Sequence, residues 1–135
     1  MNPRIPTIPR MQEMNRLLII LIMKDLAPKI YRQRLIVEGK CAEIITDAQI
    51  REYLAELSEK LQMHALTTPI THRSDKFGWA GWIHWETSGC HFYAWDTPFP
   101  FFSADIYTCK KFDVDVAVNY TKEFFHATEI EHKSI

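Results

Sequence analysis

A run with three tryptophans, "WAGWIHW" at residues 79–85, constrains the fold more than any other stretch of this chain. In an extended strand, successive side chains point to opposite faces, so Trp79 and Trp85 share one face and Trp82 lies on the other. Because tryptophan is largely apolar, we expect much of both faces of this strand to be buried. Helices of the same chain can cover one face. Burial of the other face needs a further copy of the chain, so we predict a homodimer that packs sheet on sheet, or a higher homo-oligomer.

Two segments carry helical patterns. Residues 46–63 show the clearer one, because their apolar side chains fall on a single helical face: Ile50, Leu54, Leu57 and Leu61. Thr46 and Gln49 match a capping box, which predicts that this helix begins there. A second helix is predicted from "DVDVAVNYTKEFF", with Asp113 as its N-cap.

Extended patterns surround these helices. They lie at 31–38, at 64–72 with Pro69 at an edge or bulge, at 79–95 as one extended run with a break at Gly89, at 102–109 and at 127–135. The order β-α-β-β-β-α-β predicts an α+β fold, a two-layer sandwich with a mostly antiparallel sheet and both helices on one face. We expect residues 31–135 to form this domain. Residues 1–30 are expected to form an N-terminal extension with a helix at Met11–Leu26.

Charge and cysteine usage argue against several classes of function. The net charge is −1 with no basic face, so nucleic acid is not the expected partner. The apolar run Leu17–Met23 is far shorter than the ~20 residues of a membrane-spanning helix, so we expect no membrane association. Cys41, Cys90 and Cys109 form no CxxC motif or Cys/His quartet, and we expect no metal site. An odd number of cysteines without a signal peptide suits the reducing cytoplasm.

Three motifs bring the sequence close to a known family. "ADIYTC" at 104–109 is similar to that family's "VDIFTC", while "RLIVEGKC" and "FFHATEIE" resemble its first strand and its last helix and strand. With the order of elements, they indicate a resemblance to the bacterial and archaeal S-adenosylmethionine decarboxylases over about residues 32–135. The resemblance implies an enzyme that makes its own pyruvoyl cofactor and decarboxylates S-adenosylmethionine for polyamine (spermidine) synthesis.

The family's processing motif is altered in this chain. The family has Glu-Ser-His, then a histidine and Trp-Pro-Glu, whereas this chain has "ETSGCHFYAWDT", which begins at Glu86. Matching Trp95 without gaps places Ser88 on the self-cleaving serine and Tyr93 on the processing histidine. Matching Glu86 to the family's glutamate instead makes Thr87 the cleavage residue. We prefer Ser88, and both alternatives stay open at this point.

The family's chemistry assigns roles to these residues. A serine in a strained turn attacks the preceding carbonyl, and the resulting ester undergoes β-elimination and hydrolysis, which leaves a pyruvoyl group in place of Ser88. Its carbonyl condenses with the substrate amine and takes up the electrons released when carbon dioxide leaves. Cys109 matches the cysteine that returns a proton. His91 is the candidate to replace the missing imidazole, since it shares a strand face with Tyr93.

Other side chains are candidates to bind the substrate. By the resemblance, Trp95 and Phe77 are candidates to flank the adenine ring, and aromatic faces also attract the sulfonium cation. Glu86 and Asp96 are candidates to accept hydrogen bonds from the ribose hydroxyls. The alternative to these roles is plain packing for the aromatic rings and a solvated strand-end charge for the carboxylates.

Competing functions follow from the sequence. One is pyruvoyl-dependent decarboxylation of S-adenosylmethionine, or of a related amine-bearing molecule, after cleavage before Ser88. Another is an uncleaved, diverged homologue that binds S-adenosylmethionine, regulates a partner or runs a different reaction. Gly89 and Tyr93, which replace two family histidines, favour this second function. A dimeric scaffold without a ligand is the third, and the match at "ADIYTC" argues against it.

Overall fold

The structure, a computed structural model, describes residues 23–135. The predicted helix at Met11–Leu26 and the apolar run Leu17–Met23 lie largely outside the described residues, and the part of that helix which is described is not helical. Tyr31–Ile135 form one compact unit. The N-terminal extension stays a prediction. No helix among the described residues is both long and apolar enough to cross a bilayer.

The described chain forms two helices and one six-stranded antiparallel sheet, which confirms the predicted α+β class. The elements are β1 (Gln33–Lys40), α2 (Asp47–Lys60), β2 (Ile70–Ser74), β3 (Gly78–Trp85), β4 (Ser88–Trp95), β5 (Phe101–Thr108), α3 (Val114–Phe125) and β6 (Glu129–Ser134). In the sheet the strands lie in the order β2-β3-β4-β5-β1-β6. The first and last parts of the domain are therefore interleaved, because β1 lies between β5 and β6.

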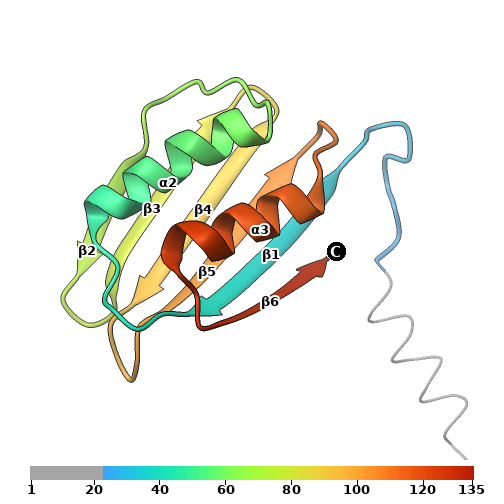
Figure 1. Ribbon diagram of the computed structural model, residues 1–135. Helices are drawn as coiled ribbons and strands as arrows, with labels where there is room; N and C mark the ends of the chain where they lie inside the picture. The colour runs from blue at the N-terminus through green and yellow to red at the C-terminus, as the bar shows by residue number, and fades with distance from the viewer. Residues whose placement is uncertain (1–22) are drawn as a thin grey trace, which may run out of the picture. The chain divides into compact units, whose positions relative to one another are not determined.

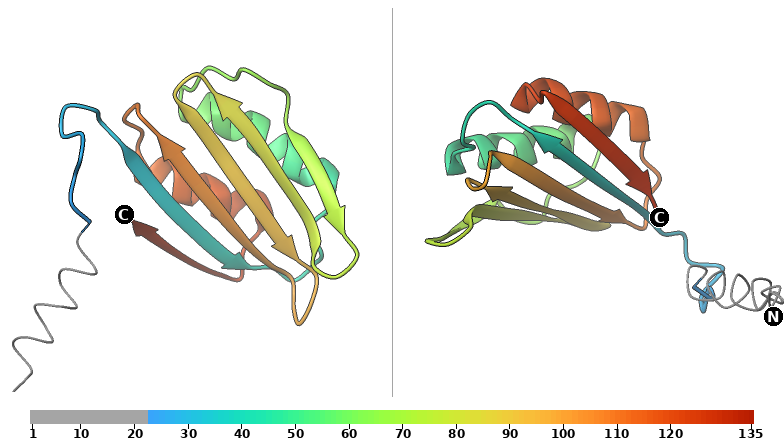
Figure 2. Two further views of the ribbon diagram at one scale, coloured as in Figure 1. Left: turned by 180° about the vertical axis from the view of Figure 1, so that it is seen from behind. Right: turned by 90° about the horizontal axis from the view of Figure 1, so that it is seen from below.

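Both helices pack on one face of the sheet (Figure 1). Views from behind and from below show that the described residues leave the opposite face uncovered (Figure 2). We call this opposite side the open face. It carries large side chains with substantial exposure, including Tyr93 at 42% and Tyr107 at 36%. The homodimer predicted from the tryptophan pattern would cover this face, and it stays a prediction.

The prediction of one extended run over residues 79–95 is wrong. The chain reverses at Glu86 and Thr87, so this run is a hairpin of β3 and β4, and the sheet has one strand more than predicted. Gly89 lies just after the reversal. A Cβ atom at Gly89 would lie only 2.3 Å from the carbonyl oxygen of Ile83. The glycine therefore permits a close approach of two strands and does not make the turn.

Both helices begin where the sequence predicts. The Oγ1 atom of Thr46 accepts the N–H of Gln49 at 3.2 Å, and the Gln49 side chain accepts the N–H of Thr46 at 2.9 Å. The Asp113 carboxylate accepts the N–H groups of Asp115 and Val116 at the start of α3. These bonds satisfy donors that a helix N-terminus otherwise leaves without a partner.

The core lies between the helices and the sheet. The apolar stripe of α2 is fully buried there, with Trp85 and Ile83 of β3 facing it. Polar groups inside the core are paired. The Trp85 indole N–H donates to Ser58 Oγ at 2.7 Å, and the Tyr53 and Thr121 hydroxyls lie 2.8 Å apart, which links α2 to α3.

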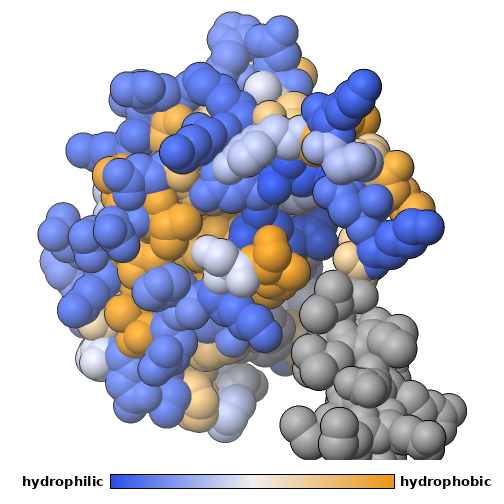
Figure 3. Space-filling model, turned by 90° about the vertical axis from the view of Figure 1, so that its right-hand side faces the viewer, coloured by the Kyte–Doolittle hydropathy of each residue, from blue (hydrophilic) through white to orange (hydrophobic). Residues whose placement is uncertain are grey.

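The β6 edge of the sheet is polar. Four of its residues carry ionisable side chains: Glu129, Glu131, His132 and Lys133. Figure 3 views the side of the molecule on which β6 lies, and hydrophilic side chains cover most of it around a smaller hydrophobic area. Charged side chains on an edge strand disfavour pairing with a further strand. This edge is therefore a poor surface for extending the sheet.

Candidate functional site

Ser88 lies at the bend of the β3–β4 hairpin, as the first residue of β4. Its φ angle is 128°, which residues other than glycine rarely adopt. Such a conformation costs about 1–3 kcal/mol and persists only where the surroundings impose it. Here Ser88 is paired with Trp85 on one side and with Thr108 on the other. The backbone is therefore strained beside the peptide bond that the sequence predicts to be cleaved.

The end of β5 meets this bend. Cys109 follows β5 directly, and its backbone N–H donates a hydrogen bond of 2.9 Å to the carbonyl oxygen of Thr87. The Cys109 side chain is exposed. The structure thus brings Cys109 next to the Thr87–Ser88 peptide bond, although the two are far apart in the sequence.

The two predicted neighbours of the cleavage site differ in their surroundings. The Thr87 hydroxyl donates to the Met63 sulfur at 3.4 Å and accepts from the Thr108 hydroxyl at 3.1 Å. Met63 and Thr108 are both buried, so the Thr87 hydroxyl is held on the inner side of the hairpin. Glu86 is exposed, and its backbone N–H donates to the carbonyl oxygen of His64.

A polar pocket of about 370 Å³ adjoins Ser88. It is lined by Arg34, Ile83, His84, Ser88, Gly89, His91, Asp105 and Tyr107, which come from β1, β3, β4 and β5. His91 stands directly opposite Asp105 in the paired strands, and such residues have Cβ atoms about 5 Å apart. The Arg34 Nε atom lies 3.7 Å from the Asp105 carboxylate, and its guanidinium covers the Tyr107 ring at 4.7 Å. The pocket therefore combines a hydroxyl, imidazoles and a charged pair.

His91 and Tyr93 are in contact, as their shared strand face predicts. The His91 Nδ1 atom and the Tyr93 hydroxyl lie 3.2 Å apart and form a hydrogen bond. His91 lines the pocket of Ser88, whereas Tyr93 lines a different pocket. The imidazole of His91, which lines the Ser88 pocket, thus lies two residues before Tyr93, the position at which the family has its processing histidine.

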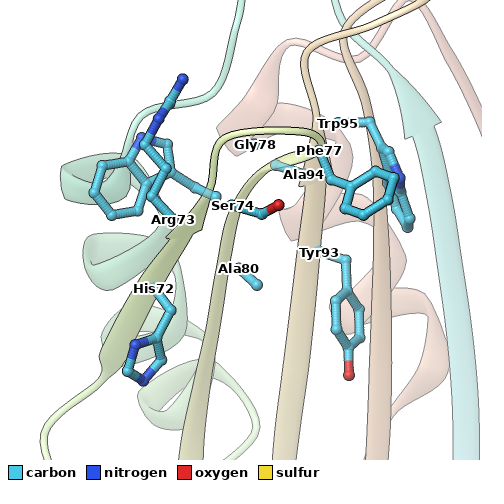
Figure 4. A pocket seen from close by; sticks show the side chains of 10 residues that line it. His72, Arg73, Ser74, Phe77, Gly78, Ala80, Tyr93, Ala94 and Trp95 are labelled. Carbon is cyan, nitrogen blue, oxygen red and sulfur yellow. The ribbon is translucent and has the colours of Figure 1, made fainter.

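That second pocket is apolar and has a volume of about 430 Å³. Figure 4 shows Phe77, Tyr93 and Trp95 on one side of it and His72 and Arg73 on the other. It lies at the end of the open face near the β2–β3 hairpin. The structure therefore brings together Phe77 and Trp95, the two residues predicted to flank adenine.

Asp96 lies just beyond the end of β4, close to this apolar pocket. Its Oδ2 atom is 3.7 Å from the Arg73 guanidinium. Its Oδ1 atom is buried and has no hydrogen-bond donor among the described residues. One oxygen of Asp96 is therefore buried without a hydrogen-bond partner among the described residues.

The predicted site residues form two groups in one chain. Ser88 and Trp95 are the first and last residues of β4, seven positions apart. At about 3.3 Å per residue, they are separated by about 23 Å. Ser88 and Cys109 lie at one end of β4, and Phe77 and Trp95 lie at the other end. His91 lies in the middle of β4 and lines the pocket of Ser88.

The charged pair of the Ser88 pocket was not predicted from the sequence. Asp105 lies inside "ADIYTC" and Arg34 begins "RLIVEGKC", but neither was singled out as a site residue. The approach of Arg34 to Asp105 depends on the pairing of β1 with β5, which joins segments about seventy residues apart. The signal that points to them is their presence in the two motifs that carry the family resemblance.

Cys90, the other cysteine near Ser88, is fully buried. Burial raises the pKa of its thiol, which disfavours the reactive thiolate. Within residues 23–135, no three His, Cys, Asp or Glu side chains are grouped as a metal site would require. The reactive candidates near Ser88 are thus Cys109 and the polar side chains of the pocket.

Comparisons with known proteins identify the family of this chain and a solved structure of similar fold. The model of the S-adenosylmethionine decarboxylase family matches residues 33–135, which is more than half of the chain. No curated protein matches the chain significantly in sequence. Among solved structures, the fold is similar to the adenosylmethionine decarboxylase from Aquifex aeolicus VF5, with a TM-score of 0.65 and 15% identity, covering 78% of this chain and 89% of that one. The chain therefore belongs to the S-adenosylmethionine decarboxylase family.

Proposed function

We propose that this protein decarboxylates S-adenosylmethionine with a pyruvoyl group that it makes by cleaving its own chain between Thr87 and Ser88. The observation that carries the proposal is the φ angle of 128° at Ser88, in a hairpin bend that Cys109 contacts. Backbone strain of this kind in a residue with a nucleophilic side chain is typical of functional sites. Decarboxylated S-adenosylmethionine would then serve polyamine synthesis, and the cytoplasm remains the expected location.

Self-cleavage begins with the Ser88 hydroxyl. Its oxygen forms a bond to the carbonyl carbon of Thr87 and gives up its proton, and the C–N bond to Ser88 then breaks as that nitrogen takes up a proton. The chain is now joined by an ester. Loss of the Cα proton of residue 88 expels the Thr87 carboxylate, and water then replaces the nitrogen, which leaves as ammonia.

The contacts of Thr87 favour Ser88 as the nucleophile. The Thr87 hydroxyl is bound to Met63 and Thr108 on the buried side of the hairpin. To attack the carbonyl of Glu86, it would have to leave both contacts. The strained φ angle also belongs to Ser88.

The residues around position 88 fit a pyruvoyl group. That group supplies a carbonyl that takes up the substrate amine and accepts the electrons left behind by carbon dioxide. Position 88 opens onto the polar pocket that His91 and Asp105 line, so a group there can reach a ligand. We assign His91 to move the proton of the Ser88 hydroxyl, with Tyr93 holding its Nδ1 atom. The exposed Cys109 thiol is assigned to return a proton to the product.

A complete site requires two copies of the chain. The apolar pocket of Phe77 and Trp95 lies about 23 Å along β4 from Ser88. That distance is too long for one S-adenosylmethionine, whose adenine and amine are joined by a ribose and a short sulfonium chain. Packing two open faces with their β4 strands antiparallel puts this pocket of one copy beside Ser88 of the other. Asp96 is then placed to accept a ribose hydroxyl.

The alternative is an uncleaved homologue that binds S-adenosylmethionine or regulates a partner. The observation that favours it is the loss of two family histidines at Gly89 and Tyr93. The Ile83 carbonyl leaves no room for a side chain at Gly89, so no histidine fits there.

Intact mass spectrometry of the purified protein tests the cleavage. We expect two chains, residues 1–87 and a chain from position 88 whose N-terminus is blocked by the pyruvoyl group. The Ser88→Ala variant should stay intact, whereas Thr87→Ala should still cleave. A single uncleaved mass for the wild type after long incubation, with S-adenosylmethionine binding retained, would establish the uncleaved alternative.

Mixed variants test the shared site. Ser88→Ala lacks the pyruvoyl group, and Trp95→Ala should bind substrate about 10–100-fold more weakly if the indole stacks on adenine. Co-expression of the two variants should restore decarboxylation, because one of the two sites in a mixed dimer contains both intact residues. If the mixture is no more active than its two components, each chain carries its own complete site.

A further inference from the structure

The carbonyl oxygen of Thr87 has a hydrogen-bond donor that no step above uses. The backbone N–H of Cys109 donates to this oxygen at 2.9 Å. The oxygen belongs to the peptide group that the Ser88 hydroxyl attacks, so the bond ends on a reacting atom. Thr108, the residue before Cys109, is paired with Ser88, and the register of β4 and β5 therefore fixes the donor beside the bend.

We propose that the backbone N–H of Cys109 is the oxyanion donor of self-cleavage. When the Ser88 oxygen bonds to the Thr87 carbonyl carbon, the second electron pair of the C=O bond moves onto the carbonyl oxygen, and the hydroxyl proton passes to a base. The N–H of Cys109 stabilises this negative charge until the C–N bond breaks. The inference rests on the proposed function and adds a catalytic group to its first step.

The donor acts on the transition state more than on the resting chain. A hydrogen bond to a charged acceptor is roughly twice as strong as one to a neutral carbonyl. The N–H lies 2.9 Å from the carbonyl oxygen in the resting chain. Oxyanion donors lie about 2.7–3.1 Å from the developing anion, so only a small movement of this oxygen is needed, and the paired strands hold the donor in place. Loss of one oxyanion donor slows a reaction by about 100–1,000-fold. Cys109 thus has two separate roles, its N–H in maturation and its thiol in turnover.

Two variants isolate the N–H from the thiol. Cys109→Ala and Cys109→Pro both lack the thiol, but only the proline variant lacks the N–H. Cleavage of each is followed by intact mass spectrometry at one pH and temperature, over days if needed. We expect the proline variant to cleave at least about 100-fold more slowly than the alanine variant.

An ester variant covers the case in which proline disturbs the fold. Residues 1–89 are ligated at Cys90 to a synthetic peptide that spans residues 90–135. In this peptide, lactic acid, the hydroxy-acid analogue of alanine, takes position 109. An ester oxygen thereby replaces the N–H in the background of the Cys109→Ala change. The matched control places an ester at Phe112, whose N–H donates to Gln33 at 3.0 Å. Both esters lose one hydrogen bond of similar length, and only the first should slow cleavage. Thermal unfolding of each variant reports its fold.

In the Cys109→Pro variant, hydroxylamine shows which step is slowed, because it splits an accumulated ester at position 88. The two ester variants are not used in this assay, because hydroxylamine also splits their backbone esters. The inference predicts no accumulation when the N–H is absent, since the ester itself forms slowly. Three results would overturn the inference while leaving self-cleavage intact. They are equal cleavage rates with and without the N–H, equal slowing by the Phe112 ester, and accumulation of the ester at position 88. Absence of cleavage in the wild type would overturn the proposed function itself.

Discussion

The close approach of β3 and β4 at Gly89 leads to a prediction about stability. A methyl group at Gly89 would lie 2.3 Å from the carbonyl oxygen of Ile83 and 3.3 Å from its carbonyl carbon. Carbon–oxygen contacts between strands are normally about 3.3–3.6 Å. In the Gly89→Ala variant the two strands must therefore separate by about 1 Å at this point, because the obstacle is backbone and cannot rotate away.

The cost follows from the bonds that this separation weakens. Two hydrogen bonds of the ladder at about 0.5–1.5 kcal/mol each, together with about 1–3 kcal/mol of packing strain, amount to about 2–6 kcal/mol. The lower entropy of the unfolded alanine chain returns about 0.4–1 kcal/mol. We therefore expect Gly89→Ala to lower the free energy of unfolding by about 1–5 kcal/mol.

Equilibrium unfolding in urea measures this change. Both proteins should carry Ser88→Ala, so that uncleaved chains are compared, and the slope of the free energy with urea should stay constant. Glu86→Ala is the control beside the same hairpin, and its exposed position predicts a change within about 0.5 kcal/mol. A loss below about 1 kcal/mol for Gly89→Ala would refute the reasoning. Gly89→His, which restores the family residue, should be at least as destabilising.

Three further changes test other parts of the structure. Ser58→Ala removes the acceptor of the buried Trp85 N–H and should cost about 1–3 kcal/mol in urea unfolding; a neutral effect would mean that the indole finds another partner. Iodoacetamide at pH 8 should modify the exposed Cys109 in the folded protein and reach Cys90 only after unfolding, because burial raises the Cys90 pKa, and peptide mapping by mass spectrometry distinguishes the two. Asp113→Ala removes the cap of α3 and should lower the stability by about 1 kcal/mol; an unchanged urea midpoint would contradict this cap.

Local rules were sufficient for the helices and the fold class. The capping residues Thr46 and Asp113 and the apolar stripe of α2 depend on neighbours within a few positions, so the sequence alone predicts them. The β3–β4 turn was missed because Glu86 and Thr87 are not typical turn residues. The nearby glycine gave a misleading signal, since Gly89 serves the contact with the facing strand.

The candidate site was predicted unevenly for a related reason. Motif matches selected Ser88 and Cys109, which the structure places next to each other, while their roles stay predictions. The approach of Arg34 to Asp105 depends on the register of β1 and β5, which no local pattern reveals. The distance between Ser88 and Trp95 follows from the bounds of β4, because both residues lie on this one uninterrupted strand.

The position of β1 has a consequence for a chain cut before Ser88. The N-terminal product would keep β1, α2, β2 and β3, and the C-terminal product would keep β4, β5, α3 and β6. Because β1 lies between β5 and β6, a strand of the N-terminal product would pair on both sides with strands of the C-terminal product. Neither product would therefore be a domain by itself. They could not separate without unfolding. Refolding would then become a second-order association of the two products, so the stability of each mature copy would depend on concentration even without its pairing with a second copy.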